Sequence, residues 1–559
     1  MKRTTLVPLI ALVALAAALP AADAPRPVAK PNIVLILADD LGWSDLSCYG
    51  GEIQTPNLDT LAAGGLRFTQ FYNGARCCPS RASIMTGLYP HAAGFPEMSG
   101  SLPANCVTIP ELLRSAGYRT FMSGKWHLGQ PGPIKRGFDE YFGMLGGYGS
   151  FWNSKLYTRL PPGRPAREYA EGTFYATDAI TDFALEFIAS ARQTADKPFF
   201  LYLAYNAPHF PLHAPKAEIA KYAQLYEQGW DKIREVRYAR QKQLGLLDER
   251  WPLSPRSTVP PNRVATAHQW ANRQNPEWHS LPADRRTDLA RRMAVFAGAV
   301  DRMDQNIGRL VTDLKQHREL DNTLIFFLSD NGACAEWDPF GFDVTNQVQQ
   351  VNLGTTSGLN LLHQGAELES MGAPGSYFSY GSGWANACNT PFRLYKHYSH
   401  EGGIATPLII HWPAGMQRPG ELDRRPGHIV DLLPTCAEVA GTAYPASING
   451  VAIQPAEGRS LCAALRGEPD AERPLFFEHE GNRAVRAGKW KLVSLAGQPW
   501  ELYDMEADRV ELQDRAAQEP ARVKELAALW DAWAKRMRAA GHWNSNANLP
   551  KPKPGTIHD

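Results

Sequence analysis

Four apolar stretches constrain the fold of this chain more than any other feature, because each of them ends in polar side chains. They cover residues 31–38, 117–123, 197–205 and 323–329. Apolar stretches without polar alternation are typical of strands that are buried on both faces of a parallel sheet. Open α/β sheets place their ligands outside the carboxyl ends of such strands. The sequence therefore predicts an α/β domain whose functional site lies along one edge of the sheet.

The polar residues after these stretches have types that suit a charged ligand. Asp39 and Asp40 follow the first stretch, Lys125 and His127 the second, His209 the third, and Asp330 and Asn331 the fourth. Two adjacent carboxylates repel each other unless a cation lies between them, and a divalent ion with oxygen ligands is the simplest candidate. Taken one at a time, these residues also fit a solvated Asp-rich turn, a surface lysine and a hydrogen-bonded histidine.

A second feature is the run Cys-Cys-Pro-Ser-Arg at residues 77–81. Pro79 fits the first turn of a helix, where its missing N–H costs nothing, so a helix is predicted to begin close to Cys77. The free amides and the positive dipole end of such a terminus favour anions, and Arg81 adds a full charge one turn further on. A nucleophile at Cys77 would meet an anionic substrate; alternatively, Cys77 is only a small buried hydrophobe.

The rest of the chain divides into a large and a small part. Apolar residues from Met293 to Leu314 form one face of a helix that we expect to pack on the sheet. Residues 216–292 are predicted to be an inserted surface element, part charged helix and part proline-rich irregular chain. Two loops are expected, an aromatic rim loop at 137–158 and a long loop at 352–391. Beyond residue 465, short strand-like segments and an amphipathic helix predict a small antiparallel sheet covered by that helix.

Composition and the amino terminus limit the class of protein. The 58 Lys and Arg residues balance 57 Asp and Glu, so no basic surface for nucleic acid is expected. Residues 1–24 combine Lys2, Arg3, an apolar run and small residues, which is typical of a secretory signal peptide. We therefore expect a periplasmic or secreted protein with no membrane segment after cleavage. The alternative is an uncleaved anchor, although the apolar run is shorter than the ~20 residues that a span needs.

Several motifs together resemble those of the sulfatase family of the alkaline-phosphatase-like superfamily. They are C-x-P-S-R with A-S-x-x-T-G at 77–87, G-K-x-H at 124–127, A-P-H at 207–209 and K-x-x-x-x-E-G-G at 396–403. The resemblance runs from Pro31 to the end of the chain. Within the family, the sequences at 229–242, 383–396 and 400–407 are similar to those of bacterial arylsulfatases. It implies a large domain over 25–465 with a mixed, mostly parallel sheet between helices, and a C-terminal subdomain over 466–559.

The resemblance also implies a mechanism. In this family the cysteine is oxidised to formylglycine by a maturation enzyme, and the hydrated aldehyde attacks the sulfur of a sulfate ester. Carried over to this sequence, Cys77 would be converted, and one Ca²⁺ would bind to Asp39, Asp40, Asp330 and Asn331. Arg81 would hold the hydrate and Lys125 and Lys396 the sulfate, while His209 would protonate the leaving alcohol and His127 would act as the base. The small-molecule substrate, an aryl or a carbohydrate sulfate, stays open.

Two alternatives remain at this stage. The first is a phosphonate or phosphate monoester hydrolase of the same superfamily, and the second is a calcium-dependent sulfate-ester binding protein with Cys77 left unconverted. Cys78 occupies the variable position of the motif and is expected to be structural. Eight cysteines are too few for a disulfide scaffold, and conversion of Cys77 would leave seven, so at least one could not pair within the chain.

Overall fold

The computed structural model describes residues 30–541, except 166, 195–196, 261–269, 337–338, 344–360 and 449. The predicted signal peptide at 1–24 and the chain after residue 541 lie outside the described residues. Among the helices that are described, none has both the length and the apolar character that a membrane span requires.

A ten-stranded, mostly parallel sheet forms the centre of the large domain, in the order β10-β2-β8-β7-β1-β6-β3-β4-β5, with β9 beside β2. The strands are β1 Asn32–Ala38, β2 Leu66–Tyr72, β3 Arg119–Gly124, β4 Glu140–Gly143, β5 Thr158–Leu160, β6 Phe199–Ala204, β7 Thr323–Ser329, β8 Ala405–His411, β9 Leu422–Asp423 and β10 Gly427–His428. The four predicted strands are β7, β1, β6 and β3, which are adjacent and parallel. β8 runs antiparallel to β7 and β2. The carboxyl ends of the four predicted strands therefore meet at one edge of the sheet, as predicted.

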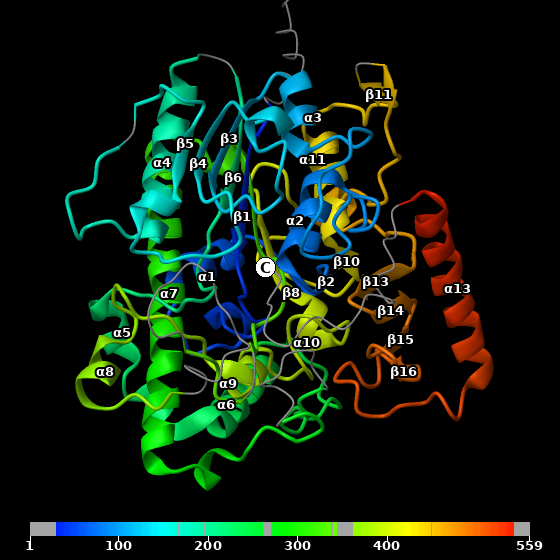
Figure 1. The fold of residues 1–559 in the computed structure, drawn as a ribbon. Helices are drawn as coiled ribbons and strands as arrows, with labels where there is room; N and C mark the ends of the chain where they lie inside the picture. Colours follow the sequence, from blue (N-terminus) through cyan, green and yellow to red (C-terminus); the bar gives the residue numbers. More distant parts are fainter. Residues whose placement is uncertain are drawn as a thin grey trace, which may run out of the picture.

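Helices cover both faces of this sheet (Figure 1). One face packs against α1 Pro56–Ala63, α4 Ala176–Arg192 and α7 Ala283–Gln316, and the other against α2 Cys77–Thr86, α3 Ile109–Ser115 and α11 Leu432–Val439. Val34 and Ile36 of β1 enter one core, whereas Ile33 and Leu35 enter the other. Because both faces are buried, β1 is apolar at nearly every position, which is the pattern that the sequence displays.

The C-terminal part is a four-stranded antiparallel sheet in sequential order, covered by one long helix (Figure 1). It comprises β13 Leu475–His479, β14 Asn482–Ala487, β15 Trp490–Ser494, β16 Glu501–Asp504 and α13 Pro520–Ala539. Trp530, Trp533 and Met537 of α13 are buried against it. The predicted fold class, a large α/β domain with a small antiparallel sheet and helix, is confirmed.

The region 216–292 contains helices with both exposed and buried faces. It contains α5 Lys216–Tyr222 and α6 Gly229–Gln243, and α7 begins at Ala283, ten residues before the apolar face that the sequence revealed. α6 lies at the surface with one face exposed, at Lys232 and Glu235, and the other face buried, at Trp230 and Arg237. Arg237 forms a 2.7 Å ion pair with Asp45, so a charged residue lies inside the molecule with its partner. The charge of this helix therefore gave no sign of its buried face.

Two predicted loops contain regular structure. The segment 137–158 includes β4 and leads directly into β5, which pairs with it at the edge of the sheet. Within 352–391, the described part forms α8 Gly365–Ser370 and the fully buried α9 Gly381–Cys388. Glycine-rich helices lack an apolar stripe, so α9 left no periodic signal. Other short elements include α10 Glu401–Ile404, α12 Cys462–Leu465, several 3-10 turns, and the hairpin β11 Ser447–Ile448 with β12 Val451–Ala452.

All eight cysteines lie in the described part of the chain, and each is a buried free thiol. The sequence left their pairing open and required only that one stay unpaired once Cys77 is converted. Cys78 Sγ donates to the carbonyl oxygens of His127, at 3.1 Å, and Met98, at 3.5 Å. These contacts tie the first turn of α2 to two loops, which agrees with a structural role for Cys78.

Candidate active site

The polar residues that follow β1, β3, β6 and β7 converge on the amino end of α2. The ten predicted site residues are Asp39, Asp40, Cys77, Arg81, Lys125, His127, His209, Asp330, Asn331 and Lys396; all except His127 are at most 3% exposed. Lys396 reaches the same edge from the loop that precedes the antiparallel β8. The structure therefore brings together every side chain that the sequence assigned to the site.

One half of the site is a pair of carboxylates with two cations. Lys125 Nζ donates to Asp39 Oδ2 at 2.7 Å, and Arg81 Nε donates to Asp330 Oδ2 at 3.0 Å. Burial opposes the charge on Asp39, but Lys125 and Arg81 lower its pKa to about 2. Burial and the nearby Asp39 raise the pKa of Asp330 well above its ordinary range. The two carboxyl groups thus share one strongly cationic environment.

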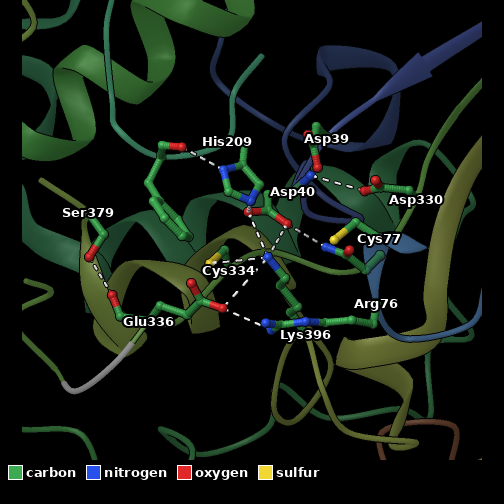
Figure 2. Close-up of polar contacts among 12 residues, drawn as sticks. Asp39, Asp40, Arg76, Cys77, His209, Asp330, Cys334, Glu336, Ser379 and Lys396 are labelled. Carbon is green, nitrogen blue, oxygen red and sulfur yellow. Dashed lines mark hydrogen bonds and ion pairs between the residues drawn. The ribbon is translucent and has the colours of Figure 1, made fainter. Parts of the chain in front are cut away.

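The other half is arranged around Asp40 (Figure 2). Lys396 Nζ lies 2.9 Å from Asp40 Oδ1, and Asn331 Nδ2 donates to the same oxygen at 2.6 Å. His209 Nε2 lies 3.4 Å from Asp40 Oδ2. Asp40 has a φ of 67°, a left-handed conformation that non-glycine residues adopt rarely. With this backbone at the strand exit, Asp40 contacts the loops that follow β6 and β7 and the loop that precedes β8.

Cys77 is the first residue of α2, as the position of Pro79 predicted. Its Sγ belongs to a group of ligand atoms from Cys77, Cys78 and His127 that lie within 4.8 Å of one another. Burial alone would raise the pKa of the Cys77 thiol. The Cys78 thiol, Lys125 and His127 instead lower that pKa well below the ordinary range. This helix terminus therefore stabilises negative charge, which an incoming anion or an oxygen nucleophile carries.

Two imidazoles line the site, His127 beside Cys77 and Cys78, and His209 beside Asp39 and Asp40. Burial lowers the pKa of His127 to about 4, so this ring is neutral near pH 7. Its Nδ1 is buried and has no hydrogen-bond partner among the described residues. Burial also lowers the pKa of His209, whose Nδ1 is 2.6 Å from the Phe210 carbonyl oxygen and whose ring stacks on Tyr148. Tyr148 belongs to the aromatic segment that the sequence placed at the rim.

The donor set of this cluster fits a hard divalent cation. Asp39 Oδ1 and Asn331 Oδ1 are buried and accept no hydrogen bond from any residue that the structure describes. One oxygen or nitrogen each of Asp39, Asp40 and His209 lies within a 4.8 Å group. Orphaned carboxylate and amide oxygens in a buried acidic cluster are the ligands that Ca²⁺ and Mg²⁺ prefer.

Sequence reasoning missed three residues beside the site, namely Arg76, Glu336 and His397. Arg76 is the N-cap residue of α2, and its NH1 donates to Glu336 Oε1 at 2.8 Å. His397 follows Lys396 and lies 3.3 Å from the same carboxylate. It also missed Gly147, where a Cβ would lie 2.5 Å from His127 Nε2. The first three stand next to motif residues or strand ends, but no motif marks them.

Comparisons with known proteins agree with this geometry. The family model described as Sulfatase matches residues 31–442, and the model for the C-terminal part of N-sulphoglucosamine sulphohydrolase matches residues 392–534. The chain is 33% identical over 541 residues to an uncharacterized sulfatase of Schizosaccharomyces pombe, covering 90% of this chain and 93% of that one. It is also 33% identical over 476 residues to an arylsulfatase of Klebsiella aerogenes, covering 78% and 95%.

A solved structure leads to the same family. The crystal structure of Ps i-CgsB in complex with k-i-k-neocarrahexaose is 26% identical, has a TM-score of 0.62, and covers 95% of each chain. Sulfatases hydrolyse sulfate esters and generally use a formylglycine and a divalent metal. The site geometry, the match over residues 31–442 and the 33% identity over nearly the whole chain show that this protein belongs to the sulfatase family of the alkaline-phosphatase-like superfamily.

Proposed function

We propose that this protein is a calcium-dependent, formylglycine-bearing sulfatase that hydrolyses small sulfate monoesters. The observation that carries the proposal is the position of Cys77 at the amino end of α2, beside Lys125 and His127. When formed from Cys77, the formylglycine hydrate supplies an oxygen nucleophile for sulfur and a second hydroxyl whose deprotonation releases sulfate. When bound at Asp39, Asp40, Asp330 and Asn331, Ca²⁺ supplies positive charge to a sulfate oxygen.

Three cations of the chain bind the anionic groups. The ammonium group of Lys125 contacts Asp39 and that of Lys396 contacts Asp40, and from there each can bind a sulfate oxygen. Arg81 is fixed by Asp330 and by the Lys125 carbonyl oxygen, so its guanidinium is oriented before substrate arrives. Preorganised positive charge in a buried site stabilises the transition state more than the same charge would in water.

The two histidines divide the proton transfers. His209 would protonate the departing alcohol or phenol from Nε2 in its imidazolium form, because Nδ1–H is held by the Phe210 carbonyl oxygen. Asp40, 3.4 Å from Nε2, favours that charged form against the opposing effect of burial. His127 is neutral near pH 7 and can accept the proton whose removal releases sulfate. The ring stacking of Tyr148 on His209 keeps an aromatic group beside the position of the leaving alcohol.

The substrate and the location of the protein are also part of the proposal. Similarity to the arylsulfatase of Klebsiella aerogenes supports an aryl sulfate as the substrate of this protein. Similarity to Ps i-CgsB, which was solved with k-i-k-neocarrahexaose, supports a carbohydrate sulfate instead. Both are sulfate monoesters, and the site chemistry above applies to either. The composition of residues 1–24 supports export to the periplasm or beyond, where calcium is available.

The first test is the chemical state of residue 77. Protein expressed with a maturation enzyme is digested, and the peptide that contains Cys77 is weighed by mass spectrometry. We expect an aldehyde at position 77 and loss of turnover in Cys77→Ala. Cys78→Ser is the matched control, because it changes the adjacent thiol and should retain the modification and turnover. An intact thiol at position 77 in a fully active protein would contradict the mechanism.

The same preparation separates the proposal from its rivals. We expect faster hydrolysis of an aryl sulfate than of an aryl phosphate, loss of turnover in a chelator, and recovery on adding Ca²⁺. Faster phosphate hydrolysis would favour a phosphate or phosphonate monoester hydrolase. Binding of a sulfate ester without turnover, with an intact thiol, would favour a binding protein.

A further inference from the structure

A buried carboxylate lies beside the site but belongs to none of the groups assigned above. Glu336 follows the end of β7 by seven residues and is 1% exposed. Its Oε1 accepts a hydrogen bond from Arg76 NH1 at 2.8 Å and lies 3.3 Å from His397 Nε2 and 3.7 Å from Lys396 Nζ. Figure 2 shows the carboxylate joined by dashed lines to the Arg76 guanidinium and to the Lys396 ammonium group.

Glu336 joins three segments that carry the groups of the reaction. It lies downstream of Asp330 and Asn331 on the chain that leaves β7. Arg76 is the N-cap residue of α2 and is bonded covalently to Cys77. Lys396 and His397 lie in the loop before β8. One carboxylate therefore fixes the distance between the nucleophile position and a cation that binds sulfate.

The charge of Glu336 also balances that of Asp40. Lys396 Nζ is 2.9 Å from Asp40 Oδ1 and 3.7 Å from Glu336 Oε1, so the ammonium group lies between two anions. A buried ammonium with one anion is drawn fully onto that partner, since the attraction is strong in a low-dielectric interior. A second anion on the far side keeps Lys396 intermediate between them and leaves it able to turn toward a sulfate oxygen.

The backbone of Glu336 is itself held in place. Its carbonyl oxygen accepts a short hydrogen bond from Ser379 Oγ. Burial opposes the charged carboxylate, yet Lys396 and Arg76 lower the pKa of Glu336 well below its ordinary range, so the group is ionised throughout the neutral range. Oε2 is buried and has no hydrogen-bond partner among the described residues. A desolvated carboxylate with one unpartnered oxygen lowers the stability of the folded protein, so a role for its charge in the site explains why it is present.

We propose that Glu336 is a positioning residue for sulfate-ester hydrolysis, which holds Lys396 and the Arg76–Cys77 junction at their working separation. This inference rests on the proposed function. Glu336 touches no reacting atom, and it acts through Lys396 and Arg76. Loss of its charge lets Lys396 move onto Asp40 and removes one anionic contact of the Arg76 guanidinium beside the nucleophile.

The test compares Glu336→Gln with the wild-type chain on an aryl sulfate. We expect kcat to fall about 100-fold, the order of loss that a 1 Å displacement of a catalytic group produces. We expect the affinity for inorganic sulfate, measured by calorimetry, to fall much less than kcat, because the lost negative charge offsets part of the lost Lys396 contact. A merely structural role would instead weaken both quantities together through loss of folded protein. Glu336→Asp, which keeps the charge, should recover part of kcat and decides the case if the Gln variant does not fold.

The matched control is Glu140→Gln. Glu140 is a buried carboxylate with arginine partners, but it begins β4, at the sheet edge opposite the site. Its loss should lower stability and leave kcat per folded molecule unchanged. A kcat within about threefold of wild type in Glu336→Gln, or equal losses in the Gln and Asp variants, would overturn the inference. If the wild-type chain hydrolyses only phosphate esters, the proposed function fails, and the same kcat comparison on that ester still decides the role of Glu336.

Discussion

At the scale of single residues, His127 gives the site its clearest pH signature. Its pKa of about 4 arises mainly from burial, with Lys125 and Arg81 adding repulsion of the charged form. A base must be neutral to accept a proton, so His127 is competent above about pH 4 and loses competence below it. We therefore expect the protonation of His127 to leave kcat on an aryl sulfate constant from pH 5 to 7 and to lower it below about pH 4. A pH–rate profile at saturating substrate measures this limb.

Two histidine variants test this prediction, one at His127 and one control at a distant histidine. His127→Asn should lower kcat by roughly 100-fold to 10,000-fold, the usual contribution of a positioned acid or base, and should remove the acid limb. His317→Asn is the matched control. His317 is the C-cap residue of α7, and about half of its side chain is exposed. This variant should leave the profile unchanged. An acid limb near pH 6.5 in the wild type would show that burial does not govern the base.

The predictability of the site also differs from residue to residue. Cys77 and Asp39 could be assigned from sequence because a helix start and a strand end determine where such side chains point. Glu336 could not, because its partner Arg76 lies 260 positions away and no local pattern links the two. Ion pairs between distant segments depend on how strands are ordered in the sheet. The sequence of a single chain does not state that order.

At the scale of elements, the β3–β6 pair positions Lys125. Gly124 ends β3 with φ of +122°, and a Cβ there would lie 1.8 Å from the Ala204 carbonyl oxygen. Lys125 N donates to that same oxygen at 2.8 Å. Only glycine allows β3 to approach β6 this closely at the residue before the lysine. The element thus supplies both the support and the direction of the Lys125 side chain.

We expect Gly124→Ala to destabilise the protein by about 3 kcal/mol or more, the sum of backbone strain and a forced shift of the strands. It should also reduce turnover, because Lys125 moves with the end of β3. Gly117→Ala is the matched control: its φ is +92°, but a Cβ there would meet nothing within 4 Å. Thermal unfolding of both variants separates strain from the clash. Equal shifts in Tm would contradict the role of the Ala204 contact.

Elements differ in how well sequence predicts them, for a physical reason. β1 and β7 are buried on both faces, so their apolar character is continuous and easily recognised. The buried helix α9, Gly381–Cys388, is built from small residues that pack closely, and these leave no stripe. α6 is rich in charge, yet Arg237 is buried because Asp45 and Glu52 pair with it. Hydrophobic patterns in a sequence reveal apolar side chains that are buried, but they do not reveal charged side chains that are buried in ion pairs.

At the scale of the whole molecule, buried charges join the C-terminal sheet to the site. Glu401, five residues after Lys396, accepts hydrogen bonds from Lys491 Nζ at 2.9 Å and Arg509 Nε at 2.8 Å. Glu511 accepts from the Glu401 backbone N–H at 2.9 Å and pairs with Lys491 at 2.7 Å. All four side chains are completely buried. The small sheet therefore anchors the loop that carries Lys396, and its stability is coupled to the catalytic domain.

This network predicts a pH-dependent stability. Burial opposes the charge on Glu401, but Lys491 and Arg509 lower its pKa from 4.5 to about 2. Since the folded pKa lies below the unfolded one, the stabilisation is complete above pH 4.5 and is lost as pH falls toward 2. We expect Glu401→Gln to lower stability by about 3 kcal/mol at pH 7, because it leaves buried cations uncompensated. The deficit in Tm relative to wild type should shrink between pH 4.5 and 2.

The control for Glu401→Gln is a salt bridge of the same type at the surface. Glu438 pairs with Arg466 at 3.1 Å, with both side chains at least 40% exposed. Glu438→Gln should change stability by less than about 1 kcal/mol, because water screens the pair. If Glu401→Gln behaves like this control, the small sheet is not anchored through Glu401. If it instead lowers Tm and also slows turnover of an aryl sulfate at temperatures well below unfolding, the anchored loop sets the position of Lys396. The contribution of the C-terminal sheet to catalysis then lies in holding one cation of the large domain.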